Sequence, residues 1–123
     1  MEKIFLYNLN SPKGRLIRRL CEQMGIPVDE VPREDYAQPI GVVVEMPGFV
    51  RHASVYSGPA FTDEIMLFRG FDDATLSRFL NRYRQAGIDK VDLKASLTPH
   101  NVLWNSFQLH DELLREHRLM KGN

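Results

Sequence analysis

Two segments of the chain carry the same order of patterns, and this order constrains the fold more than any other feature. In residues 3–31, a short apolar run is followed by an amphipathic helical pattern, a glycine and a second apolar run. Residues 65–95 repeat this plan. A strand, a helix and a second strand in this order are typical of a βαβ unit. We therefore predict an α/β fold with two βαβ repeats.

Both helical patterns have the expected start and stop signals. Ser11 can cap the first helix, over residues 13–24, and Asp72 or Asp73 can cap the second. Gly25 and Gly87 follow the last turns, where a left-handed residue often ends a helix. Superposing the halves pairs Ile4 with Ile65, Leu6 with Leu67, Leu20 with Leu80, Gly25 with Gly87, Val31 with Leu93 and Pro39 with Pro99. This agreement indicates an internal duplication.

The two units should form one four-stranded sheet with helices packed on it. We favour a ferredoxin-like strand order, which combines two βαβ halves in one sheet. The alternative is a doubly wound parallel sheet, which requires a helical crossover between the halves. We expect a single domain over residues 1–123: a first repeat in 1–39, a linker or flap in 40–63, and a second repeat with a C-terminal helix in 64–123.

The linker is too apolar for a disordered segment, because it includes three consecutive valines at 42–44 and the pair Phe49 and Val50. Three interpretations remain open. The linker adds a strand or short helix to the fold, covers a pocket as a flap, or buries itself against a second copy of the chain.

Composition excludes several classes of protein. Sixteen basic residues balance sixteen acidic ones, so no overall field attracts nucleic acid or an anionic membrane. The single Cys21 allows no internal disulfide, and no leader or membrane-length apolar run is present. We expect a cytoplasmic protein. The aromatic motif of single-strand RNA binders is also absent, so nucleic acid is an unlikely partner.

The stretch 91–104 holds the best candidate site. Alternating apolar residues predict a strand, and Thr98 followed by Pro99 predicts the start of the longest helix, over 99–118. A helix start can hold an anion, with Lys94, Thr98 and Asn101 adding a charge and two polar groups. We also count Trp104 among the candidate ligand-binding residues of this stretch. Alternatively, Thr98 and Asn101 only satisfy the helix end while Trp104, the single tryptophan, packs on the core.

A second polar cluster follows the second predicted strand. Under the duplicated plan, Asp35 and Tyr36 lie where Ser96 to Thr98 lie in the other half, so Asp35 could approach Lys94 and complete a ligand-binding site. The alternative is an ordinary surface turn with a partly buried Tyr36.

Metal and cofactor sites are not indicated. His110 and His117 are two turns apart on a predicted helix, too far for two ligands of one ion. Cys21 lies in an apolar helical stripe, which is typical of a core residue. Glycine-rich phosphate loops are absent. We expect no metal, no cofactor and no catalytic residue.

Several segments resemble an uncharacterised family of short bacterial proteins, domain of unknown function 3783. The resemblance lies in residues 32–36, 38–39, 41, 65–68, 70–71, 86–88, 93–95, 97–99, 101, 104 and 111–117. His100 departs from it, since a smaller polar residue is expected there, and 46–62 shows no resemblance. The family implies no activity.

Two functions therefore stay open. We favour a small non-enzymatic binding or regulatory domain that associates with itself or with a protein partner through the apolar linker or an exposed sheet edge. The alternative is an anion or small-molecule site, enzymatic or not, at the start of the last helix.

Overall fold

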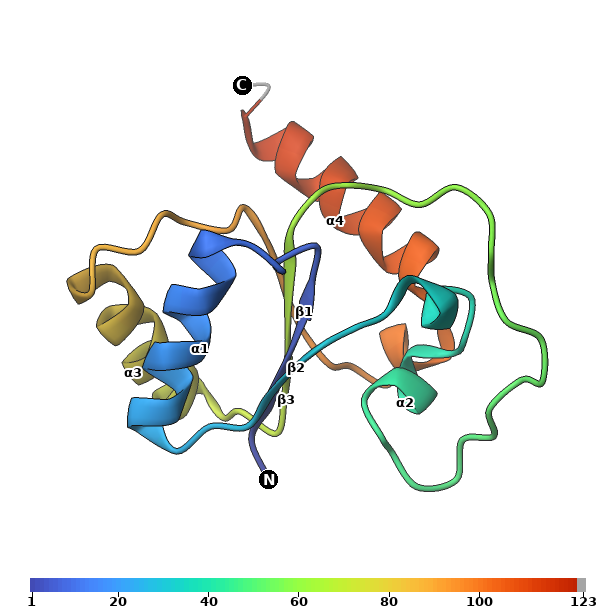
Figure 1. Cartoon of the computed structure of the whole chain (residues 1–123), viewed down its shortest axis with the longest axis horizontal. Coiled ribbons are helices and arrows are strands. Elements are labelled where there is room, and N and C mark those ends of the chain that lie inside the picture. Colours follow the sequence, from blue (N-terminus) through green and yellow to red (C-terminus); the bar gives the residue numbers. More distant parts are fainter. Residues whose placement is uncertain (122–123) are drawn as a thin grey trace.

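A four-stranded sheet forms the centre of the protein, whose computed structural model describes residues 1–121 (Figure 1). The strands are β1 (Lys3–Tyr7), β2 (Val28–Glu30), β3 (Ile65–Arg69) and β4 (Leu93–Ser96). The α-helices are α1 (Pro12–Met24), α2 (Ile40–Val43), α3 (Asp73–Gln85) and α4 (Ser106–Lys121). Two 3₁₀ turns, η1 (Arg33–Asp35) and η2 (Asn101–Leu103), follow the second strand of each unit. The α/β class and the two βαβ units are confirmed.

The strand order is β2-β1-β3-β4. The strands β1 and β2 are parallel, β3 and β4 are parallel, and the central pair β1 and β3 is antiparallel. The favoured ferredoxin-like order was wrong, because there a strand of the other unit separates the two strands of each unit. The antiparallel central pair also rules out the doubly wound parallel sheet. The sequence could not distinguish the observed order from the ferredoxin-like order. In both, β1 and β3 are central and β2 and β4 are outer, so each strand has the same apolar pattern.

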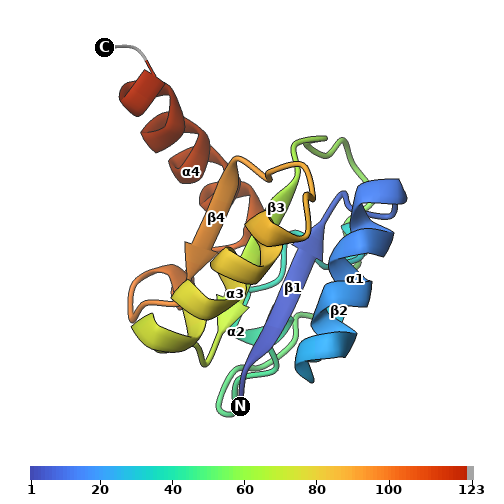
Figure 2. The same ribbon diagram turned by 90° about the vertical axis from the view of Figure 1, so that its left-hand side faces the viewer.

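Helices cover both faces of the sheet, as Figures 1 and 2 show from two sides. One face, with Ile4, Leu6, Met66 and Phe68, packs on α1 and α3. The other face packs on α2 and α4 and includes Phe5, Tyr7, Ile65 and Leu67. Both central strands are therefore apolar on both faces, which explains their continuous apolar sequence.

The predicted superposition of the two halves was wrong by one residue in the first strands. It paired Ile4 with Ile65, which lie on opposite faces of the sheet. A shift of one residue exchanges the faces of a strand, and a strand that is apolar on both faces gives no signal of its phase. The two units are alike in architecture, while their common origin stays a prediction.

The linker begins with the short helix α2 and continues as an irregular segment, here called the strap (residues 46–62). Buried Gln38 binds the strap at His52, where Gln38 Nε2 donates to the His52 carbonyl (2.8 Å) and His52 N donates to Gln38 Oε1 (2.7 Å). Phe49 packs over Gly41, whereas Val50 is 79% exposed. These contacts hold the strap against the rest of its own chain. A role of the strap as a flap or as an interface stays a prediction.

Ser11 and Asp72 cap α1 and α3 as predicted, by accepting from Gly14 N (3.1 Å) and Thr75 N (2.7 Å). In α1 the chain passes so close to the end of β1 that a Cβ at Gly14 would collide with the Leu9 carbonyl oxygen. Only glycine leaves room for this approach.

We predict that Gly14→Ala destabilises the protein by about 3 kcal/mol or more, because backbone must move to accept the methyl group. The control is Gly87→Ala, where φ is +71° but the space around the Cβ is open. That change should cost only about 1–2 kcal/mol. Urea unfolding followed by circular dichroism measures both, and equal losses would contradict the close approach.

Candidate functional site

Four of the six predicted site residues line one groove of about 270 Å³ between β4 and α4: Lys94, Thr98, Asn101 and Trp104. Part of the stretch 91–104 therefore lines one groove, and this groove lies at the outer edge of the sheet. Its local structure differs from the prediction, and the difference decides what the groove can bind.

Thr98 and Asn101 close a turn by binding one another. Asn101 N donates to Thr98 Oγ1 (3.0 Å), Thr98 N donates to Asn101 Oδ1 (2.9 Å), and Asn101 Nδ2 donates to the Ser96 carbonyl (3.0 Å). Asn101 is only 6% exposed. These polar groups hold the end of β4, which agrees with the structural alternative considered for them.

The long helix does not begin at Pro99, and this prediction was wrong. Thr98 and Pro99 start only the 3₁₀ turn η2, after which Trp104 is extended (φ −80°, ψ 166°) and α4 begins at Ser106. Asn105 caps α4 reciprocally: its Oδ1 accepts from Gln108 N (2.9 Å), and Asn105 N donates to Gln108 Oε1 (2.8 Å). The free helix start predicted near Lys94 is therefore absent.

Backbone contacts with a distant segment cause this interruption. Ile40 N donates to the Trp104 carbonyl (2.7 Å), and Ser106 N donates to the Tyr36 carbonyl (3.0 Å). A continuous helix would use the Trp104 carbonyl internally, so these contacts replace helical hydrogen bonds. Sequence-local rules do not include such partners.

The strand side of the groove is the outer edge of β4. Lys94, Ala95 and Ser96 all line it, although successive side chains of a strand point to opposite faces. A groove meets three consecutive residues when it runs along the edge of the strand. Because β4 is the last strand in the order, its outer edge has no strand partner within residues 1–121.

The helix side of the groove is one stripe of α4. Leu109, Glu112, Leu113 and Glu116 line it, and their spacing of three and four residues places them on one side of a helix. Leu109 is buried, whereas Leu113 is only half-buried. The stripe therefore offers both apolar surface and two carboxylates.

The charges of the groove do not favour an anion. Glu112 pairs with Arg115, whose hydrogen bond holds the pKa of Glu112 below its usual value. Lys94 Nζ donates to the Val91 carbonyl (2.6 Å), and burial lowers the pKa of Lys94 while Asp92 opposes this change. The charged side chains on the α4 wall are Glu112 and Glu116, and Lys94, the one basic lining residue among those that the structure describes, is hydrogen-bonded to its own backbone.

Asp35 and Tyr36 do not join this groove. Asp35 pairs with Arg51 of the strap (2.7 Å), and Tyr36 is buried against Phe61 in a stacked arrangement with ring centroids 4.9 Å apart. Asp35 follows β2 and Lys94 lies in β4, and these strands are at opposite edges of the sheet. The expected approach of Asp35 to Lys94 was wrong, although the backbone of Tyr36 does reach Ser106.

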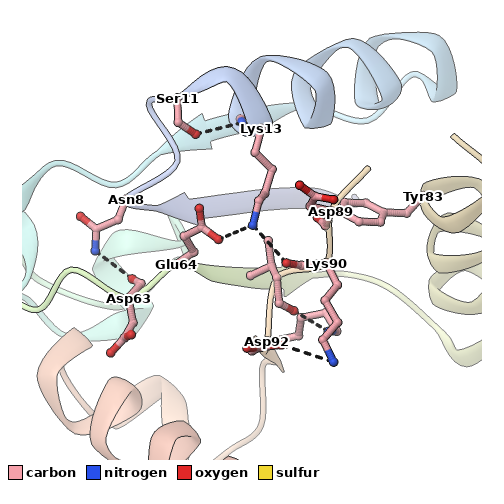
Figure 3. A network of polar contacts seen from close by, with 12 residues as sticks. Asn8, Ser11, Lys13, Asp63, Glu64, Tyr83, Asp89, Lys90 and Asp92 are labelled. Atoms are coloured by element: carbon pink, nitrogen blue, oxygen red, sulfur yellow. Dashed lines mark hydrogen bonds and ion pairs between the residues drawn. The ribbon is translucent and has the colours of Figure 1, made fainter. Parts of the chain in front are cut away.

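Sequence reasoning missed a polar cleft of about 350 Å³ at the end of β1 (Figure 3). Lys13 Nζ pairs with Glu64 (2.7 Å) and donates to the Lys90 carbonyl (3.1 Å), and Lys90 pairs with Asp92 (3.5 Å). Asp63 also lines this cleft and pairs with His110 Nε2 (2.8 Å). These residues come from four distant segments, so no local pattern could have grouped them.

This cleft offers no evident metal site. Within residues 1–121, no three His, Cys, Asp or Glu side chains are grouped so that they could hold a metal ion.

Cys21 is fully buried, and burial raises its pKa to about 11, which keeps the thiol protonated. None of the described helices has the length and apolar character needed to cross a bilayer.

Comparison with known protein families gave a match to part of the chain. Residues 64–120 match a family model described as a domain of unknown function (DUF3783). This segment, which is somewhat less than half of the chain, is similar to that family. The match extends from the start of β3 through most of α4 and includes the whole groove, so the predicted resemblance is confirmed there. The resemblance of residues 32–41 stays a prediction. Neither curated proteins nor solved structures gave a match.

We predict that Asn101→Ala destabilises the protein by about 2–3 kcal/mol, because it leaves two partly buried backbone groups, Thr98 N and the Ser96 carbonyl, without their partner. The matched control is Asn81→Ala, in which an exposed side chain is removed and the change should stay within about 0.5 kcal/mol. Thermal and urea unfolding report both values. A loss at Asn101 no larger than at Asn81 would mean that the turn does not depend on it.

Proposed function

We propose that the protein is a non-enzymatic binding domain that takes an extended segment of a partner protein into the groove between β4 and α4. The observation that carries this proposal is one groove lined on one side by the outer edge of β4 and on the other by the stripe of α4 at Leu109, Glu112, Leu113 and Glu116. An extended chain that lies between them would contact both.

The edge of β4 can supply main-chain hydrogen bonds. Peptides that add a strand to an exposed sheet edge gain affinity from such bonds and specificity from the side chains beside them. Asn101 Nδ2 already binds the Ser96 carbonyl, so it marks one end of the available edge. The three residues from Lys94 to Ser96 are enough for a short added strand, comparable in length to β2 (Val28–Glu30).

Apolar contacts can come from Trp104 and Leu113, which are both only half-buried in the free protein. Covering apolar surface stabilises a complex by roughly 25 cal/mol for each Å² removed from water. Aromatic side chains are also frequent anchors in binding surfaces. The groove thus combines an unpaired strand edge with incompletely covered apolar side chains.

The charge of the helical wall selects the peptide. Glu112 and Glu116 lie one turn apart on α4, and both line the groove. Glu112 is already paired with Arg115, so a lysine or arginine in the bound segment would pair chiefly with Glu116, whereas an acidic residue would be repelled. We therefore infer that the partner segment is basic.

Trp104 provides the test, because the single tryptophan of the chain lines the groove. Degenerate short peptides with one fixed lysine should change its fluorescence at lower concentration than the same pool with a fixed glutamate. Peptides with N-methylated backbones should not bind, because they lack the donors that pair with the strand edge. Glu116→Lys should weaken binding of the lysine pool by about fivefold.

The control variant is Glu22→Lys on α1, which makes the same charge change on the other face of the sheet. It should leave binding unchanged. Equal affinity for both peptide pools, equal effects of the two variants, or undiminished binding of N-methylated peptides would contradict the proposal. If the wild-type protein sediments as a dimer and does not bind peptide, the outer edge of β4 pairs with a second copy of the chain instead.

A further inference from the structure

A second cavity lies on the opposite face of β4, and we propose that it binds a small amphipathic organic anion, such as a carboxylate with an apolar tail. The cavity lies between α3 and β4 and has a volume of about 350 Å³. Pockets for small ligands commonly begin near 300 Å³. This site lies on the other side of β4 from the peptide groove and shares Lys94 with it, but its proposed ligand does not depend on peptide binding.

The walls of the cavity are apolar. Met66 of β3 and Val91 before β4 are each 1% exposed, Ile88 is 9% exposed, and Leu80 adds a half-buried side chain from α3. The apolar part of a ligand would be removed from water against these side chains. A ligand that was polar throughout would lose its hydration without replacement.

The charged side chains that line the cavity are all basic among the residues the structure describes. They are Arg84 near the end of α3, Lys90 in the following turn and Lys94 in β4. The whole chain has equal numbers of acidic and basic residues, so three basic groups without a carboxylate in the same lining form a local exception. This arrangement favours a ligand with a negative head group.

The pleat of β4 directs Lys94 to this side. Leu93 and Ala95 pack in the core beneath α4, so Lys94 between them points toward α3. Asp92 pairs with Lys90 (3.5 Å), while Arg84 makes its hydrogen bond to the neutral side chain of Asn81. Lys94 Nζ donates to the Val91 carbonyl (2.6 Å), which is neutral, so Arg84 and Lys94 both keep positive charge that a bound carboxylate could neutralise.

Tyr83 closes the cavity on the helical side. Its hydroxyl donates to the Asp89 carbonyl (2.6 Å), and burial raises its pKa to about 12. The phenol thus stays neutral and adds no negative charge to the lining. It also ties the turn with Lys90 to α3, which fixes the position of the basic residues.

The polar cleft next to this cavity has a different character. Asp63, Glu64 and Asp92 line the cleft, so an anion would meet three carboxylates there. Lys90 lines both spaces. The negative head group is therefore expected on the side of Arg84 and Lys94.

Isothermal titration of the full chain with octanoate tests the proposal, with octanol and octylammonium as neutral and cationic ligands of similar length. Octanoate should bind, and the other two should bind at least about tenfold more weakly, which corresponds to about 1.4 kcal/mol. Octanoate that does not bind, or that binds no better than octanol, would overturn the proposal.

Two double variants separate the site from general charge effects. Arg84→Gln with Lys94→Gln, which removes the two basic groups expected at the head group, should weaken octanoate binding by about fivefold or more. Arg78→Gln with Arg82→Gln removes the same charge from exposed positions of α3 outside the cavity and should leave binding unchanged. Equal losses would overturn the proposal. Leu80→Phe, which narrows the cavity, should also weaken octanoate binding, and unchanged binding there would place the ligand elsewhere.

Discussion

Two backbone hydrogen bonds between segments far apart in sequence set the geometry of the candidate groove. They join Ile40 N to the Trp104 carbonyl and Ser106 N to the Tyr36 carbonyl. Each segment follows an outer strand of the sheet, so these bonds connect the ends of the two βαβ units beneath one face. Because they hold Trp104 extended, α4 starts late and its stripe passes beside the edge of β4. Without them, a helix could continue from the η2 turn (Asn101–Leu103) and would leave the strand edge along a different path.

Side-chain packing supports the same junction. Tyr7 and Ser106 are fully buried and share a hydrogen bond of 2.7 Å, which fixes the start of α4 against β1. Phe61 of the strap stacks on Tyr36 and on His110, with ring centroids 4.9 Å and 4.1 Å apart. A buried, hydrogen-bonded pair within an aromatic cluster is costly to rearrange. The junction therefore gives β4 and α4 a fixed relative position, which a preformed binding groove requires.

Sequence predicted those parts of the fold that depend on local chemistry. Ser11 and Asp72 cap their helices, Gly25 and Gly87 follow them with positive φ, and the continuous apolar runs became the central strands. The same type of signal failed at Thr98 and Pro99, because tertiary hydrogen bonds ended the helical turn after three residues. Strand order and the pairing of His110 with Asp63 depend on contacts between distant segments, which no local pattern records. Four of the predicted site residues line one groove because β4 and η2 adjoin in sequence, whereas the acidic side chains of α4 that also line it were not predicted.

The central claim is that an added strand pairs with the outer edge of β4. Amide hydrogen exchange, measured residue by residue in the presence and absence of a lysine-containing peptide, tests it most directly. Backbone amides that gain a partner in a sheet exchange more slowly. The account predicts slower exchange within Lys94–Ser96 and unchanged exchange in β2, which forms the other outer edge of the sheet. Slower exchange in β2, or unchanged exchange in β4 at saturating peptide, would contradict it.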